Sequence, residues 1–437
     1  MYKNIFNHSN RNAILQVMKK LLYILFALLL LAPVTGELWR LPVFGFEFLP
    51  SDLIIPPLFL MWLIDKIKND RKLRLGKIGK MIVLFLFVLV TTYLLNVFRF
   101  DPIQMQTAFA YMGRFGMYLV TAIMAFDLLQ RDKTGMFKKI LLGAMTASMV
   151  LISVLGFLQL KYFSNFLELG MYLQGWDPHI GRLLSTWLDP NFIGGYLAFI
   201  LAITISVGLY FHRKNNSLWF MIMTVVSLIG IIALYMTYSR SGYLALIAVL
   251  GVLAFFKSRK LLIAGIIIAV LAFSFSPRVQ ERTIEAVDSA KSLIGLNAQV
   301  PLDPTAELRV WSWSFALEII KDHPWIGAGY GRYAYEVSHR GHGLMSDHSI
   351  GGSDSSLLTI WAQTGIFGFL SALAIGFVAA ITAIKHIWKK NDFKSYLNAG
   401  ILSGFCGAMI HSVFVNSLLF PLMMVYLWVG LGIIDES

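Results

Sequence analysis

The sequence predicts an all-α, polytopic membrane protein with about twelve transmembrane helices and one large extracytoplasmic loop that contains short helices. Of its 437 residues, 57% are hydrophobic and the mean hydropathy is +0.68, both above the values of a soluble domain. The apolar runs are continuous and roughly 17–25 residues long, which suits membrane-spanning helices and excludes a strand-built barrel. Lys and Arg gather in every second connection, as expected when connections alternate between two sides of a membrane.

Twelve apolar runs are predicted as spans. They divide the chain into membrane helices 1–9 within residues 1–276, an extracytoplasmic loop domain over 277–355 and membrane helices 10–12 within 356–437. The first span of the last group is long enough to begin outside the membrane as an extension of the loop. The predicted spans are residues 20–35, 48–65, 81–98, 114–130, 140–160, 191–211, 217–238, 242–256, 261–276, 356–384, 397–415 and 418–434.

The first apolar run, residues 18–36, has two interpretations. Its two lysines, its apolar core and the ending APVTG are typical of a signal peptide. We favour an uncleaved helix, because about 17 residues precede the lysines and the core has no good small-x-small ending.

The distribution of charge predicts the orientation. With the N-terminus inside, about two thirds of the 37 Lys and Arg residues lie in inner loops, whereas most of the 24 Asp and Glu residues lie outside. This positive-inside pattern predicts that both termini are cytoplasmic. The net charge of +13 is therefore a topology signal, and nucleic acid is not an expected partner. Cys406 is the only cysteine, which excludes an internal disulfide and a cysteine metal site.

Arg182 is the first of three arginines that stand out on the predicted outer side. It lies among apolar residues shortly before Asp189, Pro190 and Asn191, which we expect to cap the next span. An arginine beside a helix N-terminus suits a phosphate through its charge, its forked donors and the free N–H groups. The alternative is ordinary interfacial structure, since tryptophans of the kind found at membrane boundaries lie nearby.

Arg240 and Arg309 are the other two arginines that stand out on the predicted outer side. Arg240 lies in a very short connection between two spans, where an arginine is costly unless it pairs or snorkels. We weigh a functional role against simple snorkelling to lipid phosphate. Arg309 lies in a helix predicted to begin with Asp303 as N-cap and Pro304 in its first turn. The apolar side chains of this helix form one stripe, which is expected to be core: Leu308, Trp311, Phe315 and Ile319. Arg309 lies outside this stripe.

Two further features complete the loop domain. Residues 278–295 are predicted as an interfacial helix, with Val279, Ile284, Val287 and Ile294 toward the lipid. The second helix ends before His323, and the segment WIGAGYGRY follows. Its glycines are not preceded by the strand that a nucleotide fingerprint requires. We expect instead tight turns at Gly327 and Gly329 that let the backbone approach a ligand.

The order of these motifs along the chain resembles that of a known protein family. The chain contains, in this order, Arg182, SRSGYLAL, RVWSWSFALEIIKDHPWIGAGYGRY and DSSLLTIWAQTGIFG. From about Arg182 to the last span, it resembles the O-antigen ligase/polymerase family of bacterial glycan-assembly membrane proteins. The resemblance implies metal-independent, inverting glycosyltransfer on the outer side of the bacterial plasma (inner) membrane, with no cofactor. It implies an undecaprenyl-pyrophosphate-linked glycan as donor. The implied pyrophosphate-binding residues are Arg182, Arg240 and Arg309, with Asn191, His323, Gly327 and Gly329 in support.

One position departs from the ligases of this family. They usually place a His-Asn pair before the helix that follows the large loop, and here Asp354 takes the place of the histidine. A carboxylate can accept the proton of an acceptor hydroxyl, so Asp354 is the candidate catalytic base. Its alternative role is to cap the helix that starts near Ser356. His348, and after it His342, are further candidates, each of which could equally be a solvated loop residue.

We therefore predict a polymerase that joins undecaprenyl-pyrophosphate-linked oligosaccharide repeat units into a surface or exported polysaccharide. The alternative enzyme is a ligase that transfers the finished glycan to another acceptor. A transporter or flippase of the lipid-linked oligosaccharide is the alternative from another class, although it would favour ionisable residues at mid-span. The expected partners are the lipid-linked glycan, membrane lipid, and a flippase and a chain-length regulator of the same pathway.

Overall fold

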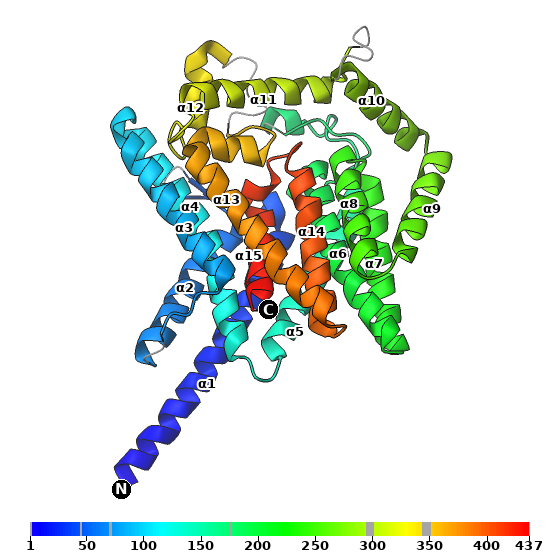
Figure 1. Cartoon of the computed structure of the whole chain (residues 1–437). Helices are drawn as coiled ribbons and strands as arrows, with labels where there is room; N and C mark the ends of the chain where they lie inside the picture. The colour runs from blue at the N-terminus through cyan, green and yellow to red at the C-terminus, as the bar shows by residue number, and fades with distance from the viewer. Residues whose placement is uncertain are drawn as a thin grey trace.

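The computed structural model describes residues 2–43, 46–69, 72–174, 176–293, 301–342 and 351–436. Figure 1 shows the path of the chain through a bundle of helices. Each of the twelve predicted spans corresponds to a helix of its own, and some spans extend up to four residues beyond the ends of that helix. These helices are α1 (Tyr2–Leu31), α2 (Pro50–Lys68), α3 (Lys77–Asn96), α4 (Pro102–Arg131), α5 (Met136–Tyr162), α6 (Pro190–Arg213), α7 (Ser217–Thr237), α8 (Arg240–Phe256), α9 (Lys260–Phe275), α13 (Ser356–Lys389), α14 (Phe393–His411) and α15 (Pro421–Asp435).

The structure confirms the helical, polytopic membrane class. Within the described ranges, seven helices are long and apolar enough to cross a membrane, or eight if α9 and the bent helix after it form one span. Helices α8 and α15 are apolar but shorter, so the number twelve stays a prediction. One detail of the all-α expectation is wrong, because β1 (Leu41–Val43) and β2 (Phe46–Phe48) pair as a small antiparallel hairpin.

The described residues of the predicted loop domain, 277–293, 301–342 and 351–355, lie as a layer across one end of the bundle, and both chain ends lie away from this layer (Figure 1). The layer is built from α10 (Pro277–Leu293), α11 (Pro304–Asp322) and α12 (Tyr333–Val337). Helix α10 is bent by 106° from α9. This bend turns the chain from the direction of the bundle to a direction across its end, as predicted for an interfacial helix.

The exposure of α10 agrees with the prediction at two of its four apolar positions. Ile284 and Val287 are exposed, whereas Val279 is buried. The prediction for Val279 is wrong because it lies in the first turn of α10, next to the bend, where the helix still packs against the bundle. The fourth position, Ile294, lies outside the described residues.

Helix α11 begins and ends where predicted. The Asp303 carboxylate accepts from the backbone N–H groups of Thr305 and Ala306, and the helix ends at Asp322. Its predicted stripe is buried at Phe315 and Ile319, and these pack with residues of α12 and α13 as a separate apolar cluster. The prediction that the whole stripe is buried is wrong at its first residue, since the Leu308 side chain is 37% exposed. That cluster covers the C-terminal half of α11 and does not reach the turn that holds Leu308.

Helix α13 is broken at Gly365, where φ is +67° and ψ is −171°. Its first part belongs to the loop layer and its second part runs down the bundle (Figure 1), which agrees with a span that begins outside the membrane. At the break, the N–H groups of Ala328 and Gly329 donate to the carbonyls of Ala362 and Gln363. The segment after α11 therefore satisfies carbonyl groups that a broken helix leaves free.

Gly327 and Gly329 serve this contact between backbones. Both have positive φ, and a Cβ on Gly327 would overlap the backbone of Gln363. A Cβ on Gly365 would likewise overlap the carbonyl of Trp325. At Gly327 the backbone that comes close is that of α13, and at Gly329 the nearest atoms are side chains of Asn96 and Phe100. The approach of a ligand to these two glycines stays a prediction.

Candidate functional site

Arg240 is the first residue of α8, and its guanidinium forms a two-point ion pair with Asp303. The Nη1–Oδ2 and Nη2–Oδ1 distances are 2.9 and 2.8 Å. The side chains of Arg240 and Asp303 are only 14% and 10% exposed. The snorkelling alternative is therefore wrong, since Arg240 is paired inside the protein and joins a membrane helix to the start of α11.

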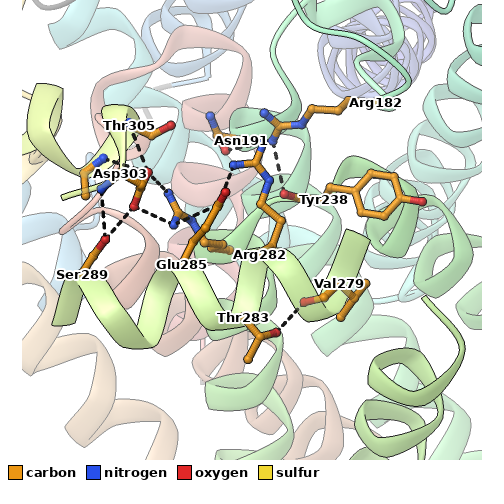
Figure 2. A network of polar contacts seen from close by, with 12 residues as sticks. Arg182, Asn191, Tyr238, Val279, Arg282, Thr283, Glu285, Ser289, Asp303 and Thr305 are labelled. Carbon is orange, nitrogen blue, oxygen red and sulfur yellow. Dashed lines mark hydrogen bonds and ion pairs between the residues drawn. The ribbon is translucent and has the colours of Figure 1, made fainter. Parts of the chain in front are cut away.

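Asp303 is the centre of this network, which Figure 2 shows together with Ser289 and Thr305. Its Oδ2 accepts from the Ser289 hydroxyl at 2.7 Å, and its Oδ1 accepts from the backbone of Thr305 at 3.1 Å. Burial raises the pKa of Asp303, but the hydrogen bonds from Arg240 and Ser289 outweigh this effect and hold the pKa at about 2. Asp303 is therefore ionised at neutral pH and occupies both Nη atoms of Arg240.

Arg182 is positioned by the turn between α7 and α8. Its Nε donates to the carbonyl of Thr237 at 2.8 Å, and its Nη2 lies 3.5 Å from Asn191 Oδ1 and 3.4 Å from the carbonyl of Tyr238. Within the described residues, these polar contacts are to neutral groups. Burial lowers the pKa of Arg182 to about 10, and Arg282 and Arg278 contribute. The guanidinium is still charged at neutral pH and has no carboxylate bound to it there.

Asn191 joins three elements around Arg182. Its Oδ1 also accepts from the Ser239 hydroxyl at 3.0 Å, and its backbone carbonyl accepts from His411 Nε2 at 2.9 Å. Its own N–H donates to Asp189, which caps α6 as predicted. Asn191 therefore lies next to Arg182, and its supporting role at a pyrophosphate site stays a prediction.

Two arginines that sequence reasoning missed extend this charge. Arg278 and Arg282 are four residues apart on α10, so they share one face of that helix. Arg278 donates to the carbonyls of Gly181 and Ile180 and lies over the ring of Tyr238 at 4.4 Å. Arg282 pairs with Glu285 at 3.0 Å. The spacing RVQER in a predicted interfacial helix is the signal that could have identified them.

The site also holds a histidine at its edge. Burial and then the charges of Arg182, Arg282 and Arg278 lower the pKa of His179 to about 3. Burial is the largest cause of this low pKa, and the three nearby arginines add to it. This end of the bundle is therefore electropositive between α10 and the start of α6.

Arg309 has a different environment. Within the described residues, no hydrogen bond or ion pair engages its guanidinium. Burial lowers its pKa, and the charges that act on it are those of Asp354, Arg240, Asp303 and Asp189. A half-buried arginine without a bound carboxylate has donors to offer to an anionic ligand.

Asp354 is close enough to Arg309 to act on its pKa, and its backbone N–H donates to Ser312 Oγ at 2.7 Å. The alternative role of Asp354 as a helix cap is wrong. Ser355 is the N-cap of α13, and its hydroxyl accepts from the N–H of Leu358. Asp354 cannot cap α13 because the helix starts one residue too late, with Ser355 at the N-cap position. His348 lies outside the described residues.

His323 lies apart from the arginines named above. Its Nδ1 is 3.3 Å from the Nη1 of Arg99, and its carbonyl accepts from the N–H of Gly327. His323, Gly327 and Gly329 belong to the joint between α11 and the break in α13. The structure thus brings Arg182, Arg240, Arg309, Asn191 and Asp354 to one region and places the other predicted supporting residues elsewhere.

His411 is a second histidine that sequence reasoning missed. It is fully buried at the end of α14, and Gly195 of α6 leaves room for its ring. Its Nε2 donates to Asn191, so its position is coupled to that of the residue beside Arg182. No sequence signal distinguishes it from any histidine at the end of a span. Across the described residues, no group of three His, Cys, Asp or Glu side chains is arranged to hold a metal ion.

The chain shows one family match. Residues 225–373 match the family model described as O-antigen ligase, and a search of curated proteins finds no match. The matched stretch runs from α7 into the second part of α13 and includes Arg240, Arg309 and Asp354, whereas Arg182 and Asn191 precede it. The resemblance inferred from the motifs is confirmed, together with a broad ligase- or polymerase-type function. Over residues 225–373, about a third of its length, this chain is similar to the O-antigen ligase family of membrane glycosyltransferase-type enzymes.

Proposed function

We propose that this protein is a polymerase that joins undecaprenyl-pyrophosphate-linked oligosaccharide repeat units on the extracytoplasmic side of the bacterial plasma membrane. The observation that carries the proposal is the arrangement of Arg182 and Arg309 at the end of the bundle covered by α10 and α11, with Asp354 near Arg309. Two guanidiniums without a bound carboxylate suit a pyrophosphate, and a carboxylate beside them suits a proton acceptor.

The chemistry is a single displacement. A hydroxyl of the acceptor sugar attacks the anomeric carbon of the donor glycan, and the new C–O bond forms as the bond to the pyrophosphate oxygen breaks. Asp354 accepts the hydroxyl proton, and undecaprenyl pyrophosphate leaves with the electron pair. The arginines stabilise the negative charge that develops on the leaving oxygen. Displacement on one face inverts the anomeric configuration, and the step needs no cofactor.

The three predicted arginines divide into two roles in this proposal. Asp303 occupies both Nη atoms of Arg240, so we assign Arg240 to positioning α11, on which Arg309 lies. Arg309 and Arg182 are left to contact the pyrophosphate. Asn191 orients Arg182, and we place His323, Gly327 and Gly329 in the support of α13.

The ligase alternative is favoured by the description of the matched family, which is O-antigen ligase. The polymerase is favoured by Asp354, which stands where ligases of the family usually have a histidine. A transporter is disfavoured because the buried charges of α2 and α4 lie near the ends of these helices. For example, Lys66 and Asp127 pair close to the C-terminal ends of both. The flippase and the chain-length regulator remain expected partners.

The test uses the full-length protein, purified and supplied with undecaprenyl-pyrophosphate-linked repeat units alone. A polymerase converts them into a ladder of longer lipid-linked chains, whereas a ligase leaves them unchanged until a second acceptor is added. Arg309→Gln should abolish the ladder, because it removes the charge at the leaving group. Arg340→Gln is the control, since Arg340 lies in the loop domain but pairs with Asp322. A full ladder from Arg309→Gln would overturn the assignment of Arg309.

A further inference from the structure

A cavity lies at the end of the bundle away from the α10–α12 layer. Its volume is about 860 Å³, and it is lined by the middle of α1, by the C-terminal ends of α2 and α4 and by the connection after α2. These are the segments in which the positive-inside pattern is strongest. The cavity is therefore on the predicted cytoplasmic side, separate from the arginines of the proposed active site.

The lining of this cavity is strongly basic. Two acidic residues, Asp65 and Asp127, face six basic ones, which are Lys19, Lys66, Lys72, Arg74, Arg131 and Lys133. Lys66 pairs with Asp127, and Arg131 pairs with both carboxylates. Within the described residues, no hydrogen bond or ion pair engages the charged ends of the other four. The cavity therefore keeps a net charge of about +4 when each acid is matched with one base.

The walls of the cavity are fixed by buried contacts. Trp62 Nε1 donates to Asp127 at 2.9 Å, and Asn69 donates to Asp65 at 3.0 Å. Leu22 and Leu128 are buried and contribute an apolar wall beside the basic rim. Within the described residues, a rim of cations without ion pairs lies next to an apolar wall on the predicted cytoplasmic side. This combination matches a phosphate attached to a hydrocarbon chain.

We propose that this cavity binds a phosphate-type anion, supplied by the headgroup of an anionic membrane lipid of the cytoplasmic leaflet. Lys19 approaches the phosphate from α1, Lys72 and Arg74 approach it from the connection after α2, and Lys133 approaches it from the turn after α4. The bound anion removes the repulsion among these four cations. It thereby ties α1 to the C-terminal ends of α2 and α4.

The test compares lipid binding by the purified full-length protein and by two triple variants. Lys19→Gln, Lys72→Gln and Lys133→Gln remove three lysines of the cavity. The matched control, Lys385→Gln, Lys389→Gln and Lys390→Gln, removes three lysines from the end of α13 on the same predicted side. Binding of phosphatidylglycerol is measured by native mass spectrometry and by thermal unfolding, against phosphatidylcholine of the same chain length. A separate arm adds inorganic pyrophosphate without lipid.

We expect the wild type and the control to retain phosphatidylglycerol in preference to phosphatidylcholine. The cavity variant should bind it about 100-fold more weakly, because each basic residue near an anionic surface contributes about fivefold to binding. Equal losses in both variants, or no preference over phosphatidylcholine, would overturn the proposal. Stabilisation by pyrophosphate that the cavity variant lacks, without retention of lipid, would keep the anion site and overturn its lipid source.

Discussion

The pair formed by Arg240 and Asp303 leads to a prediction with a defined magnitude. The pKa of Asp303 is held at about 2, about two units below that of an unperturbed aspartate, which corresponds to roughly 2.6 kcal/mol. Solvent screens a pair that is not fully buried, and we therefore expect about 1–2 kcal/mol of stability from it. Asp303→Asn removes this contribution but keeps the N-cap of α11, because Asn and Asp cap a helix about equally well.

The sign of the pH dependence follows from the depressed pKa. The stability that this carboxylate contributes is complete above the pKa of the unfolded state, near 4, and is lost as the pH falls toward 2. Thermal unfolding of the purified protein, followed by tryptophan fluorescence, should show Asp303→Asn melting roughly 1–4 °C below the wild type at pH 7. The difference should narrow as the pH is lowered through this range.

A double-mutant cycle separates the pair from other effects. Arg240→Gln and Asp303→Asn should be less than additive when combined, with a coupling of about 1 kcal/mol or more. Arg240→Lys keeps the charge but loses the fork, so it should retain only part of the coupling. If Asp303→Asn melts like the wild type at pH 7, or if the two changes are additive, the pair does not join α8 to α11 in the way described.

Three other outcomes can be checked. Asp354→Asn should accumulate single lipid-linked units at normal protein abundance, because the amide cannot accept the proton; wild-type chain lengths would remove Asp354 as the base. Gly365→Ala should lower the abundance and the melting temperature through a strained φ and an overlap, by about 1–3 kcal/mol, and an unchanged melt would contradict the account of the break. In a Cys406→Ala background, a cysteine at Glu307 should react with an impermeant reagent in intact cells and one at Asn391 should not, and labelling of Asn391 from outside would reject the orientation.

Much of the local structure could be predicted because it depends on neighbours in the chain. Apolar runs locate the helices, since a backbone in a membrane must satisfy its own hydrogen bonds. Asp189 and Asp303 were predicted as caps, because a cap requires only a side-chain oxygen and the N–H groups two or three residues on. The end of α11 before His323 follows from local preferences of the same kind. The resemblance to the O-antigen ligase/polymerase family could be recognised because the motifs occur in a fixed order along the chain.

The roles of particular side chains depended on contacts that no local pattern encodes. Arg240 and Asp303 are 63 residues apart, so the sequence could show that an arginine at that turn needs a partner but not which one. Ser355 rather than Asp354 caps α13, because the start of a helix within a run of polar residues is decided by the packing of its first turn.

The sequence by itself determined the membrane class, the positions of the helices, the asymmetry of charge and the outer arginines, all of which follow from composition and short-range geometry. Only the tertiary structure decided that Gly327 and Gly329 meet the broken backbone of α13 and that Arg278 and Arg282 join Arg182. It alone also placed four basic side chains, which have no ion pair within the described residues, around one cavity. These depend on how the helices pack. Packing brings together residues from distant parts of the chain, whose approach is set by the shapes of all the helices at once.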